Sequence, residues 1–340
     1  MILGESYRIL IDESSKTAEA RRIARRVASA IGLDETSTEK VGLVATETCT
    51  NILKHAGRGE LIVGSSAEGR DPIPLLDLMA LDQGPGFANL NEVLTDGYST
   101  ANTNGTGLGA IVRLSKVSDF YSLPQKGTAV LARWWRNGNG NSGEKTTNLR
   151  VHGVNIPKAG EEVSGDAWTT VQHNDVVVIL LADGLGHGLE AHLASCEAVR
   201  VLRDNPDLSP KPLLDRIHHA LRATRGAAVA IARIDSAHGK LTFAGVGNAS
   251  ARIYSGNRLC QSAVSMNGTA GHHCEKVHEF SYPWPANGVL QLNSDGLSSG
   301  ASLERYPGLA LRDPALIAGV LYRDFTRGRD DSTVVIAKAS

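Results

Sequence analysis

The chain has 340 residues, of which 21% are charged and 41% hydrophobic, and its formal net charge at pH 7 is −1. Such a length favours about two domains, and such a composition is typical of globular proteins. Because the chain is almost neutral, it lacks the basic character of nucleic-acid binders, and we expect no direct nucleic-acid partner.

The cysteines and the longest apolar run indicate a cellular location. Four cysteines lie far apart without a Cys-x-x-Cys pair, which is typical of reduced thiols in a cytosolic protein. The N-terminus lacks a basic stretch followed by an apolar run, so we expect no signal peptide. The longest apolar run, at 176–182, is too short to span a bilayer and fits a buried strand. We therefore expect a soluble, cytoplasmic protein with no membrane partner.

The first half begins with a predicted strand at 7–11 and a helix near 18–31 that ends at Gly32. A second helix has the capping box Thr36-x-x-Glu39 and ends at Gly57. The remaining predictions are strands near 61–64 and 75–81, a loop rich in Gly, Asn and Thr at 96–107, a helix near 108–117, and strands at 120–123 and 128–135. This order predicts a mixed sheet covered by helices, an α+β sandwich.

A polar segment at 136–148 separates the two halves. It has no apolar residue and is rich in Gly and Asn. Since it cannot bury surface to offset the entropy of ordering, we expect a flexible linker between a first domain at 1–135 and a second at 149–340.

The second half is rich in predicted strands, at 151–156, 167–173, 176–182, 227–234, 240–244, 251–254, 288–293 and 333–337. Helices are predicted at 189–203, 212–224 and 314–325. Two antiparallel sheets with flanking helices would satisfy this pattern.

The first candidate site begins on the second predicted helix. Glu47 and Asn51 are four residues apart and Lys54 follows on the same side, so the three share one helix face. Asn51 offers an oxygen ligand to Mg²⁺, and Glu47 could orient or deprotonate an attacking hydroxyl or water. On spacing alone, an ordinary solvated helix face is the more common explanation.

Glycine-rich segments provide the context that favours a nucleotide site. A strand runs into Asp82-Gln-Gly84-Pro-Gly86, and Gly105-Thr-Gly107-Leu-Gly109 begins a helix. Glycines let the backbone approach phosphates, and a helix N-terminus offers free N–H donors. Asp82, at the strand end, is placed to accept a hydrogen bond from an adenine amino group.

With these motifs the first half resembles the Bergerat (GHKL) ATP-binding fold. Glu47-x-x-x-Asn51 matches its N box, the Asp82 segment its first glycine box, the Gly105 segment its lid box, and Gly127-Thr128 its late Gly-Thr pair. The resemblance implies bound ATP and Mg²⁺. The implied nucleotide contacts are Asn51, Asp82, Gly84, Gly86, Gly105, Gly107, Leu108, Gly109 and Thr128.

Within that fold, the segments 51–59 and 96–100 resemble the RsbT branch of anti-sigma-type serine kinases. This resemblance implies phosphorylation of a serine or threonine on a STAS-domain regulatory protein. Glu47 and Lys54 would be its catalytic residues, with Lys54 neutralising phosphate charge. A histidine kinase is disfavoured, because the sequence has no dimerisation helix with a phosphoacceptor histidine.

The second candidate site consists of aspartates at predicted strand ends. Asp183-Gly184 follows the apolar strand at 176–182, and Asp295-Gly296 follows that at 288–293. Asp166 and the pair Asp330-Asp331 come just before strands. One Asp-Gly is most often a turn, but repeated aspartates after buried strands are not. Clustered carboxylates repel unless a cation is bound, so the grouping predicts metal and hydrolysis of a phosphate ester.

These residues resemble the SpoIIE/RsbX branch of the metal-dependent PPM phosphatases over about residues 150–340. The family has an α-β-β-α sandwich fold. The resemblance implies Mn²⁺ or Mg²⁺ held by Asp166, Asp183, the Gly184 carbonyl, Asp295 and one of the final pair, of which we favour Asp330. Ser164 stands where this branch commonly has glycine, which is tolerable if its φ is negative.

Two groups of histidines have alternative interpretations. His187 is either a proton donor to the leaving serine oxygen or a cap of the helix that starts at Leu189. Gly271-His-His-Cys274 with His278 could be imagined as a zinc site, but its spacing favours a surface loop. The turn at 245–248 is expected to approach the aspartates.

The two halves together predict a bifunctional signalling enzyme that phosphorylates and dephosphorylates STAS-domain regulators. The alternative is a phosphatase whose first domain only binds a partner or gates activity, with ATP as a ligand. The intact Glu47 favours chemistry. A dimer is compatible with the sequence.

Overall fold

The computed structural model describes residues 6–68, 73–88, 107–136, 149–173, 175–274 and 276–339. The chain divides into two compact units: the first runs to Asn139 and the second begins at Gly140, with 69–71 counted in the second. This division falls inside the predicted linker at 136–148. Since 137–148 lie outside the described residues, the linker and the domain limits stay predictions.

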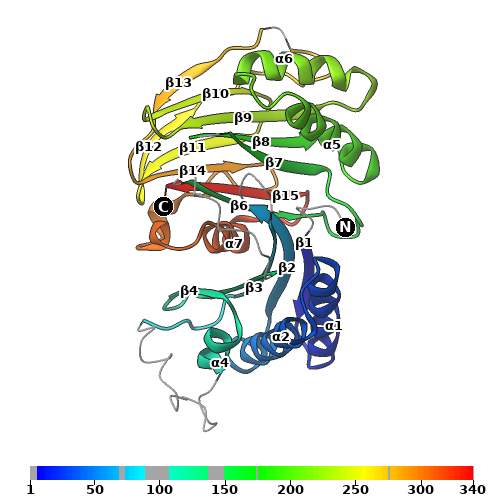
Figure 1. Ribbon diagram of the computed structural model, residues 1–340, viewed down its shortest axis with the longest axis vertical. Helices are drawn as coiled ribbons and strands as arrows, with labels where there is room; N and C mark the ends of the chain where they lie inside the picture. Colours follow the sequence, from blue (N-terminus) through cyan, green and yellow to red (C-terminus); the bar gives the residue numbers. More distant parts are fainter. Residues whose placement is uncertain are drawn as a thin grey trace. The chain divides into compact units, whose positions relative to one another are not determined.

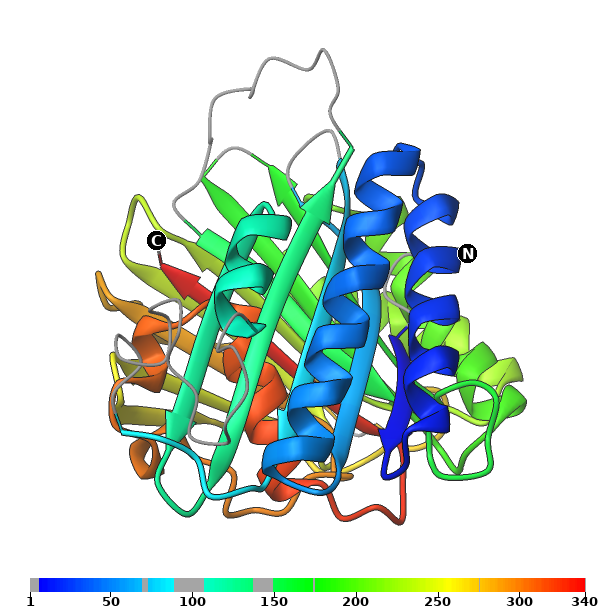
Figure 2. The same ribbon diagram turned by 90° about the horizontal axis from the view of Figure 1, so that it is seen from below.

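The first unit is a five-stranded sheet with helices on one face (Figure 2). Its strand order is β1 (Ser6–Ile11), β2 (Gly59–Glu68), β3 (Ile73–Asp82), β5 (Gly127–Trp135) and β4 (Val117–Leu123). Its helices are α1 (Ser15–Ala30), α2 (Glu35–His55) and α4 (Gly107–Leu114). The predicted helix-and-sheet sandwich is confirmed.

Two local predictions for this unit are wrong. The sheet is not mixed, since each of its strand pairs is antiparallel. The chain runs along the sheet in α1 and returns in α2 before it enters β2. Strand β2 is therefore antiparallel to β1. The cap of α2 is Asp34, whose carboxylate accepts a hydrogen bond from the Ser37 N–H at 2.7 Å. Thr36 lies inside the first turn, and Glu39 instead pairs with Arg25 and Arg21 of α1.

The core of the first unit explains why α2 presents one face to solvent. Val41, Val44, Thr48 and Ile52 are buried, as the sequence spacing predicts. Val41, Val44 and Ile52 pack in the same core as the buried ring of Trp134 on β5. The opposite face of α2 is thereby held outward as a rigid platform.

The second unit has two five-stranded antiparallel sheets (Figure 1). The first sheet has the order β13 (Phe280–Pro283), β10 (Lys240–Val246), β9 (Ala227–Asp235), β8 (Val176–Gly184) and β7 (Asp166–His173). The second has the order β12 (Arg258–Ala263), β11 (Ser250–Ser255), β14 (Gly288–Asn293), β15 (Ser332–Ala339) and β6 (Leu149–Ile156). Helices α5 (Leu189–Asp204) and α6 (Pro210–Ala220) cover the first sheet, and α7 (Pro314–Phe325) covers the second.

This arrangement confirms the predicted α-β-β-α sandwich. Strand β8 is buried on both faces. Val177, Ile179 and Leu181 point into the core between the sheets. The alternate residues, Val178, Leu180 and Ala182, pack under α5 and α6. A strand covered on both faces reads as a continuous apolar run, as 176–182 does. Such burial fixes the position of the residues that follow the strand.

Candidate functional sites

In the first unit, α2 and the start of α4 bring together residues from two predicted motifs. Glu47 and Asn51 are half-buried on the outward face of α2. Gly107 lies against both, because a Cβ added to it would stand 2.5 Å from Glu47 Oε1 and 3.2 Å from Asn51 Nδ2. No larger residue fits there without displacing the carboxylate.

Asp82 at the end of β3 organises the other side of this site. Its Oδ1 accepts hydrogen bonds from the backbone N–H of Gly84 at 2.9 Å and of Thr128 at 3.1 Å. Gly127 has φ +86°, and a Cβ there would lie 2.0 Å from the Asp82 carbonyl oxygen. The structure therefore brings together Asp82 and the Gly-Thr pair, although 46 positions separate Thr128 from Asp82.

The remaining predicted residues of this site lie around these two groups. Gly86 has φ +62°, and a Cβ would meet the Leu123 carbonyl oxygen at 2.1 Å. Leu108 and Gly109 lie in the first turn of α4, and Lys54 is exposed near the end of α2. Gly105 and the loop at 96–100 lie outside the described residues.

In the second unit, four of the predicted aspartates end or precede neighbouring strands. Asp166 at the start of β7 is paired in register with Asp183 near the end of β8. Asp295 follows β14, and Asp330 precedes β15, the strand hydrogen-bonded to β14. We call Asp166, Asp183, Asp295, Asp330 and Asp331 the aspartate cluster.

The carboxylates of this cluster act on one another across the two sheets. Burial raises the pKa of Asp183, and the charges of Asp166 and Asp295 raise it further. Burial also raises the pKa of Asp166. The pKa of Asp295 is raised by burial and then by the charge of Asp330. Mutual repulsion of this kind is what a hard cation relieves.

The two final aspartates face different neighbours. The charge of Asp330 acts on Asp183 and Asp295. The charge of Asp331 raises the pKa of Asp166, and its Oδ1 accepts a hydrogen bond from the Lys158 N–H at 2.8 Å. A Cβ on Gly165 would stand 2.8 Å from Asp331 Oδ2, so this carboxylate lies under the segment that leads into Asp166.

The donor set of the cluster fits a cation, because two of its carboxylate oxygens have no partner among the described residues. Oδ2 of Asp166 and Oδ2 of Asp331 are buried without a hydrogen-bond partner. Gly184 cannot carry a side chain, because a Cβ would lie 2.2 Å from the Ala191 carbonyl oxygen. The side chains do not form a closed ligand set, since within the described ranges no three His, Cys, Asp or Glu residues are grouped so that they could hold a metal ion. Carboxylates of like charge do not converge by themselves.

His187 does not cap α5, so that alternative is wrong. The N-cap of α5 is Gly188, without a side-chain hydrogen bond, and its φ of +74° suits glycine. His187 Nδ1 lies 2.6 Å from Glu161 Oε1 instead. Glu161, on the segment before β7, holds the imidazole beside the loop that follows Asp183.

Sequence reasoning missed Asn155 and the hydrogen bonds that the residues around the aspartates make. Asn248 donates a hydrogen bond from Nδ2 to Asp295 Oδ2 at 2.5 Å, so the turn at 245–248 does reach the cluster, as expected. Asn155 of β6 donates to the Asp166 carbonyl oxygen at 3.0 Å. Ser164 has no positive φ, and its hydroxyl accepts from the Asp166 N–H. Only the glycines around Asn248 gave a signal in the sequence.

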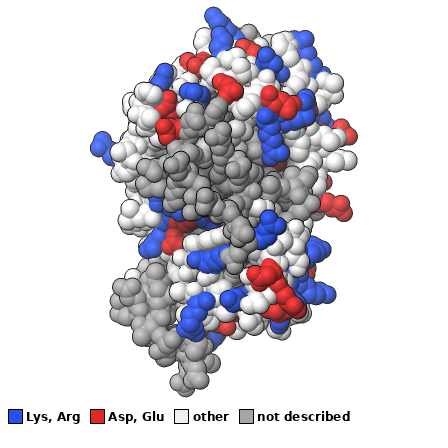
Figure 3. Space-filling model, viewed as in Figure 1, with Lys and Arg blue, Asp and Glu red and all other residues white. Residues whose placement is uncertain are grey.

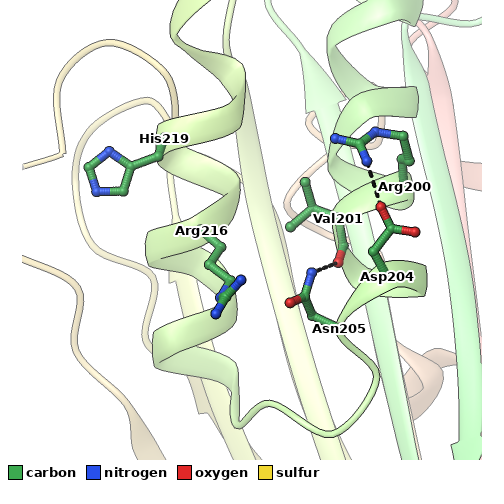
Figure 4. A pocket seen from close by; sticks show the side chains of 6 residues that line it. All are labelled: Arg200, Val201, Asp204, Asn205, Arg216 and His219. Carbon is green, nitrogen blue, oxygen red and sulfur yellow. Dashed lines mark hydrogen bonds and ion pairs between the residues drawn. The ribbon is translucent and has the colours of Figure 1, made fainter.

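A hollow between α5 and α6 is separate from the cluster (Figure 4). It is lined by Arg200, Val201, Asp204, Asn205, Arg216 and His219. Arg200 forms an ion pair with Asp204 across its edge, at 2.5 Å. On the described part of the surface in Figure 3, Lys and Arg lie interspersed with Asp and Glu, in keeping with the nearly neutral charge.

Comparison with known proteins identifies both units. Residues 12–134 match the histidine kinase-like ATPase domain, and residues 173–340 match the stage II sporulation protein E (SpoIIE) family. The serine/threonine-protein kinase RsbT of Bacillus subtilis (strain 168) is 31% identical over 117 residues, which are 34% of this chain and 86% of RsbT.

Two further likenesses concern phosphatases and signalling proteins. The phosphoserine phosphatase RsbX of the same organism is 19% identical over 155 residues, 46% of this chain and 78% of RsbX. A solved structure described as "The bacterial stressosome: a modular system that has been adapted to control secondary messenger signaling" is 25% identical, with a TM-score of 0.52, and covers 56% of this chain and 99% of that one.

The first unit therefore belongs to the RsbT family of serine/threonine kinases, within the histidine kinase-like ATPases. It is fused to a SpoIIE-type serine/threonine phosphatase domain of the PP2C class, which is homologous to RsbX. The predicted fusion is confirmed. Among the helices of the described residues, none is long and apolar enough to cross a membrane.

Proposed function

We propose that this chain both adds a phosphoryl group to serine or threonine of STAS-domain regulatory proteins and removes it. The observation that carries the proposal is that each unit brings together residues suited to its chemistry. Gly107 is packed against Glu47 and Asn51 in the first unit, and Asp166 is in register with Asp183 in the second. A module that only bound ATP would have no need of a carboxylate at the position of Glu47.

In the kinase unit, the residues support in-line transfer from ATP. Asn51 would hold Mg²⁺, and the ion would neutralise the phosphate charges that build up during transfer. Asp82 would accept from the adenine amino group, and the backbone of Gly107, Leu108 and Gly109 would face the phosphates. Glu47 is placed to accept the proton of the attacking hydroxyl.

In the phosphatase unit, Asp166, Asp183, the Gly184 carbonyl, Asp295 and Asp330 would hold Mn²⁺ or Mg²⁺. When bound, two such cations activate water and neutralise the phosphate ester. Asn248 orients the Asp295 carboxylate through its hydrogen bond. His187, held by Glu161, is placed to return a proton to the leaving serine oxygen.

The kinase proposal is tested with the full chain, a candidate STAS-domain protein and ATP labelled in its γ-phosphate. We expect label on the STAS protein with the wild type and its loss with Glu47→Gln. Glu19→Gln, an exposed carboxylate of α1 that pairs with Lys16, is the matched control. If no label is transferred and ATP only alters the phosphatase rate, the first unit is a gating module instead.

The phosphatase proposal is tested with the same partner after phosphorylation. Asp183→Asn should abolish release of phosphate and leave ATP binding intact, because Asp183 lies in the second unit. Continued hydrolysis of the phosphoserine by this variant would contradict the proposed role of the cluster.

A further inference from the structure

Three leucines form an exposed apolar stripe that begins at the loop after Asp183. Eight large hydrophobic side chains are exposed within the described ranges, and Leu185, Leu189 and Leu193 are three of them. Their exposed fractions are 45%, 61% and 51%. Single exposed apolar residues are common on proteins, but several of them grouped in one place are typical of an interaction surface. The grouping therefore indicates a surface that another molecule covers.

The stripe lies on the outward face of α5, because the inward face of this helix is filled by the core. Ala194 and Ala198 are buried, and Ala198 packs in the core that contains residues of β8 and α6. Leu189 and Leu193 are one turn apart, and Arg200 follows three turns after Leu189, so all three point to the same side of the helix. The outward face thus has an apolar start and a charged end, about 16 Å apart at the rise of an α-helix.

The charged end of this face borders the hollow between α5 and α6 (Figure 4). Arg200 is neutralised there by Glu197 and Asp204. Arg216 of α6 also lines the hollow, and it forms no ion pair within the described ranges. In Figure 4 its side chain extends toward Asn205 at the end of α5. A guanidinium with unused donors binds a carboxylate by two parallel hydrogen bonds, so the hollow suits an acidic side chain of a partner.

The apolar end of the face lies next to the aspartate cluster. Leu185 is two positions after Asp183, and its N–H donates to the Gly226 carbonyl oxygen at 3.0 Å. Strand β9 then pairs Ala227 with Gly184, so the backbone that leads to Leu185 is fixed. A protein whose phosphoserine lies over the cluster also covers Leu185 and the start of α5. A small phosphate ester is too short to reach the other end of this helix.

We propose that the outward side of α5, formed by Leu185, Leu189, Leu193 and Arg200 together with Arg216, docks the phosphoprotein substrate; we call it the α5 face. The leucines contact an apolar patch beside the phosphoserine, and Arg216 binds a carboxylate of the same protein in the hollow. The inference rests on the phosphatase function proposed for the second unit. The aspartate cluster suits any phosphate monoester, whereas the α5 face selects the protein that carries it.

The test compares hydrolysis of a phosphorylated STAS-domain protein with that of p-nitrophenyl phosphate by the full chain with Mn²⁺. The double variant Leu189→Gln/Leu193→Gln removes the apolar stripe from α5, and the fold should persist because glutamine is a good helix former. We expect kcat/KM for the phosphoprotein to fall by at least about tenfold, because two leucines that the partner buries are lost. The value for p-nitrophenyl phosphate should stay unchanged. Leu311→Gln, 81% exposed in the same unit, is the matched control.

Arg216→Met tests the charged end of the face, with Arg222→Met as its control. Both side chains are exposed and each substitution removes one positive charge, but Arg222 does not line the hollow. We expect Arg216→Met to lower kcat/KM for the phosphoprotein by about tenfold at low salt and by less at high salt, because the contact is between charged groups. Arg222→Met should match the wild type, and neither variant should alter hydrolysis of p-nitrophenyl phosphate.

The inference is overturned if the double leucine variant keeps the wild-type kcat/KM for the phosphoprotein, or if it loses activity equally toward both substrates. Equal losses in Arg216→Met and Arg222→Met would likewise overturn the role of the hollow. Sedimentation of the wild type and the double variant tests a second copy of the chain as the occupant. A dimer that the two substitutions dissociate, with unchanged hydrolysis of the phosphoprotein, would make the α5 face a self-interface and contradict the inference.

Calorimetric binding of the phosphoprotein separates this inference from the proposed function. If the wild type and the double variant hydrolyse the phosphoprotein equally well, the function stands and the docking surface fails. If the wild type binds the phosphoprotein without hydrolysing it and the double variant does not bind it, the function fails and the docking surface stands. If the wild type neither binds nor hydrolyses it, both fail.

Discussion

Gly107 at the start of α4 lies so close to Glu47 of α2 that a Cβ would stand 2.5 Å from the carboxylate oxygen Oε1. Gly107→Ala must therefore displace Glu47. We expect at least a tenfold loss of phosphoryl transfer, because displacements of about 1 Å at a reacting group cost up to roughly 100-fold. The measurement is transfer of labelled phosphate from ATP to a STAS-domain protein.

Thermal unfolding of the same variant distinguishes a local effect from a damaged fold. The added Cβ would meet the end of the Glu47 side chain and no backbone atom, so the unfolding temperature of Gly107→Ala should not fall. A variant that transfers phosphate at the wild-type rate would show that Glu47 has no place in the chemistry.

The first unit also contains a buried ion pair between Asp77 of β3 and Arg133 of β5, whose atoms Oδ1 and Nε are 2.5 Å apart. Both side chains are nearly inaccessible, with 9% and 5% of their surface exposed. Asp77→Ala leaves the guanidinium buried beside an apolar group, and we expect a loss of about 3–5 kcal/mol in the free energy of unfolding.

The control for this prediction is the exposed pair of Arg8 and Glu60, 2.6 Å apart in the same sheet. Glu60→Gln should cost no more than about 1 kcal/mol, because solvent screens the pair. Urea denaturation measures both values. If the two variants lost the same free energy of unfolding, burial would not make the Asp77–Arg133 pair more important than the exposed pair.

Elements with strong local signals could be predicted from the sequence. The limits 314–325 of α7 were predicted because Pro314 suits only the first turn of a helix, and Asp313 indeed caps it by accepting from the Ala315 N–H. Strands β12 and β13 were missed. The first is largely exposed and lacks the alternation of a half-buried strand, and the second alternates over only four residues, too few to indicate a strand.

The residues of the candidate sites likewise divide into those that local sequence patterns predict and those that they do not. The aspartates could be found because each adjoins an apolar strand, and Glu47 and Asn51 because helix spacing places them on one face. The contact of Asn248 with Asp295 spans 47 positions, and no local pattern encodes it. The cap of α2 was misplaced by two positions, because Asp34 and Thr36 are both good capping residues and only the backbone geometry decides between them.

Burial raises the pKa of the Cys49 thiol on α2 from 9.0 to about 12. A thiol with a raised pKa contributes stability that is full below the pKa of the unfolded chain and is lost as pH rises toward the folded value. We expect the free energy of unfolding of the first unit to fall between about pH 9 and pH 12. Cys49→Ala should flatten this dependence in urea denaturation curves.

Alkylation of the same thiol gives an independent measurement. Cys49 is buried and Cys260 is exposed, so a thiol reagent near neutral pH should modify Cys260 and leave Cys49 intact until the chain unfolds. Mass spectrometry of the modified peptides shows which of the two cysteines is alkylated first. Rapid modification of Cys49 in the folded chain would contradict the burial on which the pH dependence rests.

Asp330 and Asp331 are adjacent, but they are predicted to differ in metal binding. The charge of Asp330 acts on Asp183 and Asp295, whereas that of Asp331 acts on Asp166 and its Oδ1 accepts a hydrogen bond from the Lys158 N–H. Asp330→Asn should therefore weaken Mn²⁺ binding by at least about tenfold and reduce phosphate release in parallel, because a charged oxygen ligand is lost. Asp331→Asn retains an acceptor oxygen for Lys158, so its loss of Mn²⁺ affinity should be smaller. Calorimetric titration with Mn²⁺ ranks the two variants, and a greater loss in Asp331→Asn would assign the ligand to Asp331 instead.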